Sequence, residues 1–303
     1  MKILFDNVNL ESSSGPNGFA KKLFSSLSKE SEITPQVTLD ENDLPDIQLS
    51  FIASYFKCAP IVQRLDGIYF NSDQDFENLN KPINMTYKVS DAVIFQSVFN
   101  KMLTEHYFGK HDNAIVIHNG TDIDLISTIE EMDHHLLDKF SDVWCCASSW
   151  RPHKRLKENI RYFLEVAPEN ACFIVAGENT DEPIRDKRVF YAGHLDWVML
   201  ISLFKRASHF VHLSWLDHCP NVVIDARASG CHIVCSSAGG TKEIAGKNST
   251  ILLEDSWDFS PLKLYSPPEI DFSKTTTCEK ESNIDITNAM KKYIDVFKSV
   301  TSL

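Results

Sequence analysis

Two carboxylates, Asp217 and Asp225, stand seven residues apart in the stretch "DHCPNVVIDARASG". "NVVIDARASG" predicts a helix, with Pro220 at or near its first position and Gly230 at its end. Helical side chains lean toward the N-terminus, so Asp225 can point back to the start of its helix, where the loop places Asp217. Carboxylates accept hydrogen bonds from hydroxyl groups, whereas a helix start with its bare N–H groups favours phosphate. The pair therefore indicates a site for hydroxyls beside a phosphate.

Basic residues gather in "SSWRPHKRLKENI", at the start of the second half of the chain. A strand is predicted to end near Ser149, and Arg151, Lys154 and Arg155 follow before a helix. One interpretation is a basic segment that is simply solvated. We favour a diphosphate clamp, since guanidinium and ammonium groups here join a loop and a helix N-terminus. With the two acids, such a clamp fits a nucleotide-sugar.

Three further loops offer weaker signals. Gly15 and Gly18 in "SGPNG" follow the first strand, where they either let backbone N–H groups approach a phosphate or form an ordinary turn. Arg64 and Asp66 in "QRLDGIY" are either an internal pair that fixes a turn or a pair that faces a ligand, with Asp66 accepting a proton or a sugar hydroxyl. The turn at Gly239 and Gly240 is either packing or a wall of the phosphate pocket. His209 and His212 would point to opposite faces of a strand, so we do not expect them to form a paired site.

The elements that must position these residues are ten short apolar runs of strand length, between many of which lie helical patterns, such as those at residues 18–28, 98–108, 155–166 and 197–206. The predicted strands are "KILF", "IQLSFIA", "PIVQRL", "AVIFQS", "AIVIHN", "DVWCCASS", "CFIVAGE", "VFYAGH", "HFVHLS" and "HIVCSS". This alternation predicts an α/β fold with parallel sheets covered on both faces. The series runs twice, with a break near Gly120. We therefore expect two Rossmann-like domains that face a cleft, residues 1–120 and 121–303, with a last amphipathic helix that can pack back across. In such sheets ligands bind in the loops at the carboxyl ends of the strands.

Composition narrows the choice of partner. The 303 residues are 43% hydrophobic and carry a net charge of −12, which disfavours nucleic acid and an anionic membrane surface as main partners and leaves at most peripheral membrane contact. No apolar run reaches the roughly 20 residues that span a bilayer, and the N-terminus predicts a strand, not a signal peptide. We expect a cytoplasmic protein. Its eight cysteines lie mostly in apolar runs and predict core packing, with no metal site.

Taken together, these motifs resemble the retaining family-4 glycosyltransferases, which have the GT-B fold of two facing Rossmann-like domains. That family typically has a Glu-x7-Glu motif and a later Gly-Gly…Glu segment, which are similar here to Asp217-x7-Asp225 and to Gly239, Gly240 and Glu243. "QRLDGIY", "SDAVIFQSVF" and "VIHNGTD" are also similar to a pattern in one branch of the family. Both motif glutamates are aspartates in this chain, so about 1.5 Å of reach must be recovered by the backbone or by the donor.

The resemblance implies a metal-independent transfer from a UDP- or GDP-sugar, a co-substrate in place of any cofactor, to a saccharide or glycan. Asp225 would hold the ribose, Asp217 the donor sugar, and Arg151 and Lys154 the departing diphosphate. Arg64 and Asp66 would face the acceptor, with Asp66 counted among the catalytic residues. The remaining donor contacts are expected at Gly15, Gly18, Ser149, Gly193, Cys219, Pro220, Asn221 and Val222.

Three alternatives stay open. The aspartates permit a catalytically silent nucleotide-sugar-binding protein. A sugar-nucleotide epimerase shares the GT-B fold. A viral type of enzyme that glycosylates DNA bases is the third, although the net charge of −12 counts against it.

Overall fold

The computed structural model describes residues 1–12, 14–178 and 183–301. The chain forms two compact units. The first unit consists of Met1–Asp122, the short segment Phe259–Leu262 and the described residues from Asn283 onward, and the second of Ile123–Asp258 and Lys263–Ser282. Each unit contains one sheet with its own covering helices.

The sheet of the first unit is wholly parallel, with strand order β2-β1-β3-β4-β5-β6. Its central strands are buried along their whole length, which explains why their sequences are continuous apolar runs instead of alternating ones. The strands are β1 (Lys2–Asp6), β2 (Thr34–Gln36), β3 (Ile47–Phe51), β4 (Ile61–Leu65), β5 (Ala92–Phe95) and β6 (Ala114–Val116).

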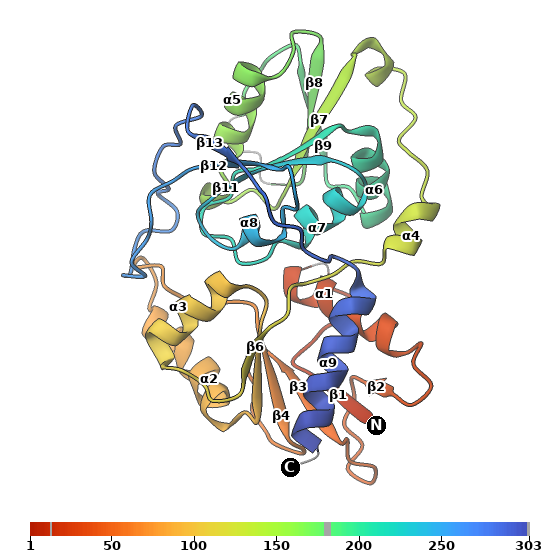
Figure 1. The fold of residues 1–303 in the computed structure, drawn as a ribbon, viewed down its shortest axis with the longest axis vertical. Coiled ribbons are helices and arrows are strands. Elements are labelled where there is room, and N and C mark those ends of the chain that lie inside the picture. Colours follow the sequence, from red (N-terminus) through yellow and green to blue (C-terminus); the bar gives the residue numbers. More distant parts are fainter. Residues whose placement is uncertain (13, 179–182, 302–303) are drawn as a thin grey trace. The chain divides into compact units, whose positions relative to one another are not determined.

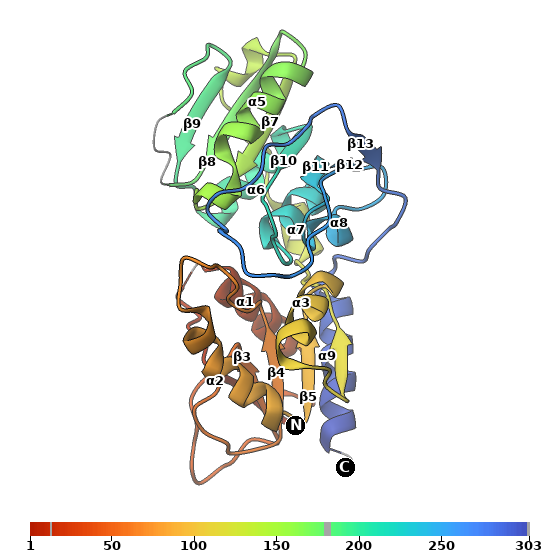
Figure 2. The same ribbon diagram turned by 90° about the vertical axis from the view of Figure 1, so that its left-hand side faces the viewer.

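Four helices belong to this unit: α1 (Gly15–Leu27), α2 (Phe76–Val89), α3 (Val98–Phe108) and α9 (Ile286–Thr301). The last of these, drawn in blue in Figures 1 and 2, lies alongside the first sheet although it ends the described chain. It buries Met290, Tyr293 and Phe297 in a core shared with α1, β1 and β3. At its start, the N–H of Ile286 donates to the carbonyl of Thr121, and the N–H of Thr121 donates to the carbonyl of Ile284 (2.9 and 2.8 Å).

The sheet of the second unit has the order β13-β12-β11-β10-β7-β8-β9 and is parallel except for β13. Its strands are β7 (Asp142–Ala147), β8 (Ala171–Ala176), β9 (Val189–Gly193), β10 (His209–His212), β11 (His232–Ser236), β12 (Thr250–Leu252) and β13 (Thr275–Thr277). The helices and 3-10 turns are α4 (Ile123–Thr128), η1 (Leu137–Lys139), η2 (Pro152–Lys154), α5 (Leu156–Val166), α6 (Trp197–Arg206), α7 (Asn221–Ala228) and α8 (Thr241–Ile244).

Helices cover both faces of this second sheet. On one face, α5 lies over the strands β7 and β8 (Figure 2). Phe163 of this helix stacks on Phe173 of β8 with ring centroids 4.9 Å apart. On the other, Phe204 of α6 meets Phe210 of β10 edge to face at 5.0 Å. The expected α/β fold with two parallel Rossmann-like sheets is thereby confirmed.

Three sequence expectations can be compared with the described residues. All eight cysteines are free thiols, and six of them are buried. No helix in the described ranges is long and apolar enough to cross a bilayer. Within residues 1–12, 14–178 and 183–301, no group of three or more His, Cys, Asp or Glu side chains is placed to hold a metal ion.

Candidate functional site

The strand order of the second sheet reverses between β7 and β10. From β7 the chain continues to β8 and β9 on one side, and it returns to β10, β11 and β12 on the other. β7 and β10 are direct parallel neighbours, so the loops at their carboxyl ends emerge side by side. Ligands of open α/β sheets bind at such a reversal point. The loop after β7 carries Arg151 and Lys154, and the loop after β10 carries Asp217.

Lys154 and Asp217, predicted from separate motifs, are in direct contact. Lys154 Nζ lies 2.5 Å from Asp217 Oδ2, with the two side chains 20% and 14% exposed. His212, the last residue of β10, places its Nε2 3.1 Å from the same oxygen. Because a carboxylate can only accept, this nitrogen carries the proton and donates. The other oxygen, Oδ1, accepts the backbone N–H of His218 at 3.0 Å.

The charges around Asp217 keep it ionised. Burial by itself would raise the pKa of this carboxyl, but Lys154 and the His212 hydrogen bond outweigh it and hold the pKa well below its ordinary value. Burial lowers the pKa of His212 despite the opposing effect of Asp217. Burial, helped by the nearby Lys154, lowers the pKa of His153 to about 3. Lys154 and Asp217 are therefore a cation and an anion surrounded by neutral imidazoles near neutral pH.

The turn at Gly239 and Gly240 fixes the backbone that carries Asp217. The N–H of Gly240 donates to the carbonyl of Asp217 at 2.7 Å. Gly239 has φ +93°, and a Cβ built there would lie 2.5 Å from the carbonyl oxygen of Asp217. Only glycine allows this approach without a shift of the loop. The sequence left two interpretations of this turn open, packing or a wall of the phosphate pocket. The contacts with Asp217 support packing.

The three basic residues of the loop after β7 have different surroundings. Arg151 is exposed, and its side chain contacts no partner among the described residues. Arg155, only 1% exposed, is bound through both terminal nitrogens to Glu254 at 2.9 and 2.7 Å and to the carbonyl of Pro268 at 2.8 Å. Arg155 is therefore an internal ion pair, which corrects the expectation that it gathers with Arg151 and Lys154.

Asp225 lies in α7 and is buried, with 4% of its surface exposed. Its Oδ2 accepts the indole N–H of Trp197 at 3.1 Å. Trp197 is the first residue of α6, which follows β9, so this contact lies toward the carboxyl edge of the sheet. Pro220 is the N-cap of α7, Asn221 and Val222 are its first two residues and are half-buried, and Cys219 is buried just before it.

Ser149 and Gly193 also lie at the carboxyl edge of the second sheet. Ser149 is exposed two residues beyond β7. Gly193 ends β9 with φ +66°, and its carbonyl accepts the N–H of Gly177 at 2.7 Å. Their expected contact with a donor stays a prediction.

In the first unit, Gly15 and Gly18 belong to the first turn of α1 and not to a loop before it. The helix thus begins three residues earlier than the sequence pattern predicts, and the N–H of Gly18 already donates to the carbonyl of Ser14 at 2.7 Å. No atom of the described residues lies within 4 Å of a Cβ built on Gly15. The expected contact of both glycines with the donor stays a prediction.

Arg64 and Asp66 form an internal ion pair. Arg64 is 0% exposed, its guanidinium lies over the ring of Phe19 at 4.4 Å, and its Nη2 donates to Asn119 Oδ1 at 2.7 Å. Burial raises the pKa of Asp66, although Arg64 lowers it in part. The position of Arg64 matches the turn-fixing interpretation and offers no surface to an acceptor. Asp66, whose side chain is 14% exposed, keeps its acceptor-side role as a prediction.

Two residues of the second unit were missed by sequence reasoning. His212 was set aside because alternate strand residues face opposite ways, yet its partner is a loop carboxylate and not His209. Trp197 begins a helix whose pattern was recognised, but nothing in its local sequence indicates that it donates to Asp225 across 28 positions. The signal for His212 was its position at the end of a strand beside the motif loop.

Comparison with known proteins adds to this geometry. Residues 141–260 match the family model described as Glycosyl transferases group 1. Superposition with HepE from Anabaena in complex with UDP-glucose gives a TM-score of 0.66 over 100% of both chains, at 16% identity. The fold is GT-B. Sucrose-phosphate synthase from Thermosynechococcus elongatus has the same GT-B arrangement of elements, with a TM-score of 0.64, 12% identity, and coverage of 100% of this chain and 93% of that one.

A third GT-B structure is the catalytic domain of starch synthase IV from Arabidopsis thaliana bound to ADP and acarbose. It has a TM-score of 0.62 and 12% identity over 86% of this chain and 74% of that chain. No curated protein sequence matches the chain. The Lys154–Asp217 contact lies within the residues that match the glycosyl transferase model.

Proposed function

We propose that this protein is a retaining glycosyltransferase that uses a UDP- or GDP-sugar and transfers the sugar to a saccharide-type acceptor. The observation that carries the proposal is the contact between Lys154 and Asp217 at the reversal point of the second sheet. A cation for the diphosphate and a carboxylate for the sugar hydroxyls meet there. Group 1 glycosyl transferase similarity over residues 141–260 and the UDP-glucose in the HepE structure support the same assignment.

In this proposal each residue has a defined task. The diphosphate competes with Asp217 for Lys154 and takes Arg151 as a second cation. Asp217, ionised and held by His212, accepts hydrogen bonds from hydroxyls of the donor sugar. Asp225 accepts from the ribose, beside the indole N–H of Trp197. The amides of Cys219 to Val222 add hydrogen bonds at the start of α7.

The reaction breaks the bond between the anomeric carbon and the diphosphate oxygen. The acceptor hydroxyl attacks from the same face and forms the new glycosidic bond, and its proton passes to the departing diphosphate oxygen. The products are the glycoside and a nucleoside diphosphate. Arg151 and Lys154 stabilise the charge that grows on the leaving group, so they lower the barrier directly. We infer that these two cations do this without a metal ion, so chelation with EDTA should leave turnover unchanged.

The first prediction concerns Arg151. Because its side chain is exposed and has no partner among the described residues, Arg151→Ala should leave the melting temperature unchanged while lowering turnover by about 10²–10³-fold, as expected for loss of a charge-assisted bond to the leaving group. Lys154→Met, which keeps most of the side-chain length without the charge, should lower turnover at least as much. Free UDP or GDP and the new glycoside are measured with UDP-glucose, GDP-mannose and mixed acceptor saccharides.

Lys139→Ala removes an exposed cation from the turn before β7 and is the matched control, for which turnover should stay at the wild-type value. Wild-type turnover in both Arg151→Ala and Lys154→Met would contradict the proposed mechanism. Binding of nucleotide without product would instead indicate a silent binding protein. A changed donor sugar would indicate an epimerase.

A further inference from the structure

A cavity of about 620 Å³ opens within the first unit at the carboxyl end of β1. β1 lies between β2 and β3, so the strand order of the first sheet reverses here, as it does between β7 and β10 in the second. The end of β1, the residues after it, the segment after β2 and Phe56 line the cavity. None of the residues assigned to the donor or acceptor above belongs to this lining.

The polar groups of the cavity are held in place by the protein. Asp6, 8% exposed, accepts the side-chain N–H of Gln48 on its Oδ2 at 2.9 Å, and Gln48 is itself completely buried. The described residues provide no donor to its Oδ1. Asn7 donates from Nδ2 to the carbonyl of Phe51 at 2.8 Å, and Asn17 Oδ1 accepts the N–H of Asn9 at 2.9 Å. A carboxylate and amides are thus fixed beforehand in the lining, which lowers the entropic cost of binding a polar ligand.

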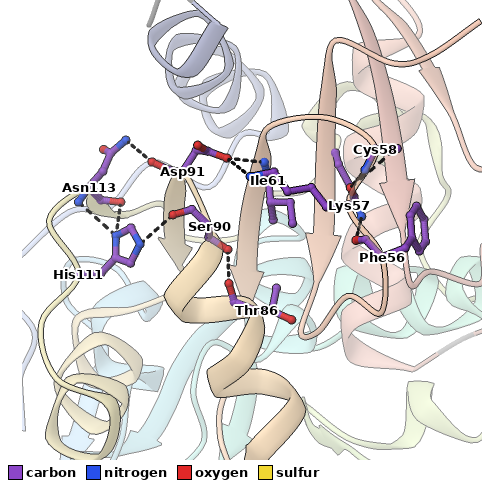
Figure 3. A network of polar contacts seen from close by, with 10 residues as sticks. Phe56, Lys57, Cys58, Ile61, Thr86, Ser90, Asp91, His111 and Asn113 are labelled. Atoms are coloured by element: carbon purple, nitrogen blue, oxygen red, sulfur yellow. Dashed lines mark hydrogen bonds and ion pairs between the residues drawn. The ribbon is translucent and has the colours of Figure 1, made fainter.

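One wall of the cavity is apolar and includes an exposed aromatic ring. Phe56 is 45% exposed, and Val8, Val37 and Leu39 continue the surface. The loop that carries Phe56 is tied down: its carbonyl accepts the side-chain N–H of Gln48 at 3.0 Å, and Lys57 Nζ lies 3.4 Å from Asp91 Oδ2. Figure 3 shows this loop beside the polar contacts of Asp91, whose carboxylate also accepts the N–H of Ile61 at 2.8 Å. The backbone that carries the Phe56 ring is therefore held in place.

The charge of the lining limits what can bind. The described residues that line the cavity include Asp6 but no lysine, arginine or histidine. A phosphate would meet a carboxylate and no cation, which opposes its binding. A hydroxyl-rich ring without charge can instead stack an apolar face on Phe56 and donate its hydroxyls to Asp6 and to the asparagine carbonyls.

We propose that this cavity is a binding site for a neutral saccharide and excludes phosphorylated sugars and phosphate headgroups. The proposal deepens the proposed function, on which it rests in taking that saccharide as the acceptor. It moves the acceptor contacts from the buried Arg64 to Asp6 and Phe56.

The test measures saccharide binding directly. Cellobiose, maltose and methyl mannoside are compared with glucose 6-phosphate by calorimetry and saturation-transfer NMR on the full chain. At least one neutral probe should bind, glucose 6-phosphate should bind at least tenfold more weakly, and Phe56→Ala should weaken the neutral probe by about 3- to 10-fold, the range expected for a ring contact. Tyr55→Ala, at an 81% exposed neighbour outside the cavity lining, is the matched control and should change nothing.

Two more variants sharpen the result. Asp6→Asn removes the charge at nearly constant size and should weaken neutral saccharides. Thr38→Lys puts a cation in the exposed part of the lining and should raise the affinity for glucose 6-phosphate. Because Thr38 and Phe56 are exposed, these tests remain valid even if Asp6→Asn fails to fold.

Equal or tighter binding of glucose 6-phosphate by the wild type would overturn the cavity proposal, and so would equal effects of Phe56→Ala and Tyr55→Ala. Binding of UDP and of GDP is measured on the same samples. A wild type that binds neither nucleotide counts against the proposed function, whereas binding of either nucleotide with no neutral saccharide bound counts against the cavity proposal alone.

Discussion

Asp217 shows how an aspartate is placed where the motif that it resembles has a longer glutamate. Its backbone lies directly against the turn at Gly239 and Gly240, with the N–H of Gly240 on its carbonyl. Its carboxylate is shared among Lys154, His212 and the N–H of His218. The position of this short acid is therefore set by the backbone of the Gly239–Gly240 turn and by the side chains of Lys154 in η2 and His212 at the end of β10.

Gly239→Ala should displace the Asp217 loop, and this is the second prediction. The added Cβ would lie 2.5 Å from a backbone oxygen at φ +93°, so strain and overpacking together should cost about 2–5 kcal/mol of unfolding free energy and raise the KM for the donor. Unfolding in urea and donor kinetics measure the two effects.

Gly230→Ala is the matched control, because Gly230 has φ +100° with no atom within 4 Å of the added Cβ. Its unfolding free energy should fall by only about 1–2 kcal/mol, the cost of a Cβ at a positive φ, and its KM for the donor should stay unchanged. Equal effects of the two substitutions would show that Gly239 is needed for its conformation and not for its contact with Asp217.

For single residues, the sequence predicts which of them belong to a site better than it predicts which side chains they contact. Lys154 and Asp217 could be assigned to one site because both follow strands whose carboxyl ends share an edge. Arg155 looked equivalent to Arg151, but its φ of +54° turns it inward to Glu254, a residue 99 positions away. Such distant pairings leave no local pattern, so Arg155, His212 and Trp197 needed the three-dimensional structure.

Among the elements, α9 is the helix that completes the hydrophobic core of the first unit. It supplies Tyr293 and Phe297, both 0% exposed, to the core of a sheet that is complete in sequence by Val116. Gly120 allows the start of this helix to approach closely, since a Cβ there would lie 2.8 Å from Ile286. The core of the first unit is thus completed by α9, which lies more than 160 positions after the last strand of its sheet.

The third prediction is that Phe297→Ala destabilises the first unit by about 3–5 kcal/mol through the cavity that it leaves. Far-UV circular dichroism follows the unfolding of helices in both units. Lys292→Ala, on the exposed face of the same helix, is the control and should stay within about 0.5 kcal/mol of the wild type. A loss of similar size in both variants would mean that α9 does not contribute through its buried face.

The elements themselves followed well from the sequence where apolar runs were long. The predicted bounds of α3 and α6 agree with the structure, and the ten predicted strands all occur. α2 was missed because Pro82 lies inside it, and β2, β12 and β13 have only three residues each, too few for a pattern to stand out. The amphipathic end of the chain predicted a helix, but not which core it completes.

For the molecule as a whole, the tryptophans give a selective probe. All five, Trp144, Trp150, Trp197, Trp215 and Trp257, belong to the second unit, and the first has none. Tryptophan fluorescence therefore follows unfolding of the second unit alone, while circular dichroism follows both units. In the Phe297→Ala experiment the fluorescence transition should stay at the wild-type midpoint.

The fourth prediction concerns acid. Burial lowers the pKa of His153 to about 3 and of His209 and His218 to about 4, all in the second unit. Unfolded histidine has a pKa of about 6.5, so between pH 6.5 and 4 the unfolded state binds protons that the folded state does not. Stability should therefore fall as pH drops through this window. The urea midpoint by tryptophan fluorescence at pH 7.5, 6 and 5 measures it.

His209→Asn should flatten this pH dependence, because it removes one of the three imidazoles whose pKa burial lowers. A midpoint that stays constant from pH 7.5 to 5 in the wild type would contradict the burial of these imidazoles. Restricting the range to pH 5 and above keeps most carboxyl titration out of the comparison.

The return of α9 to the first unit also bears on how the protein forms during synthesis. Domains are usually completed in the order in which they leave the ribosome, N-terminal part first. Here the amino-terminal unit lacks a core helix until residues 286–301 have been translated, whereas the second unit has all its described strands by Thr277. We therefore expect the nascent chain to complete its second unit before its first, and the first sheet to expose the surface that α9 covers until α9 has left the ribosome.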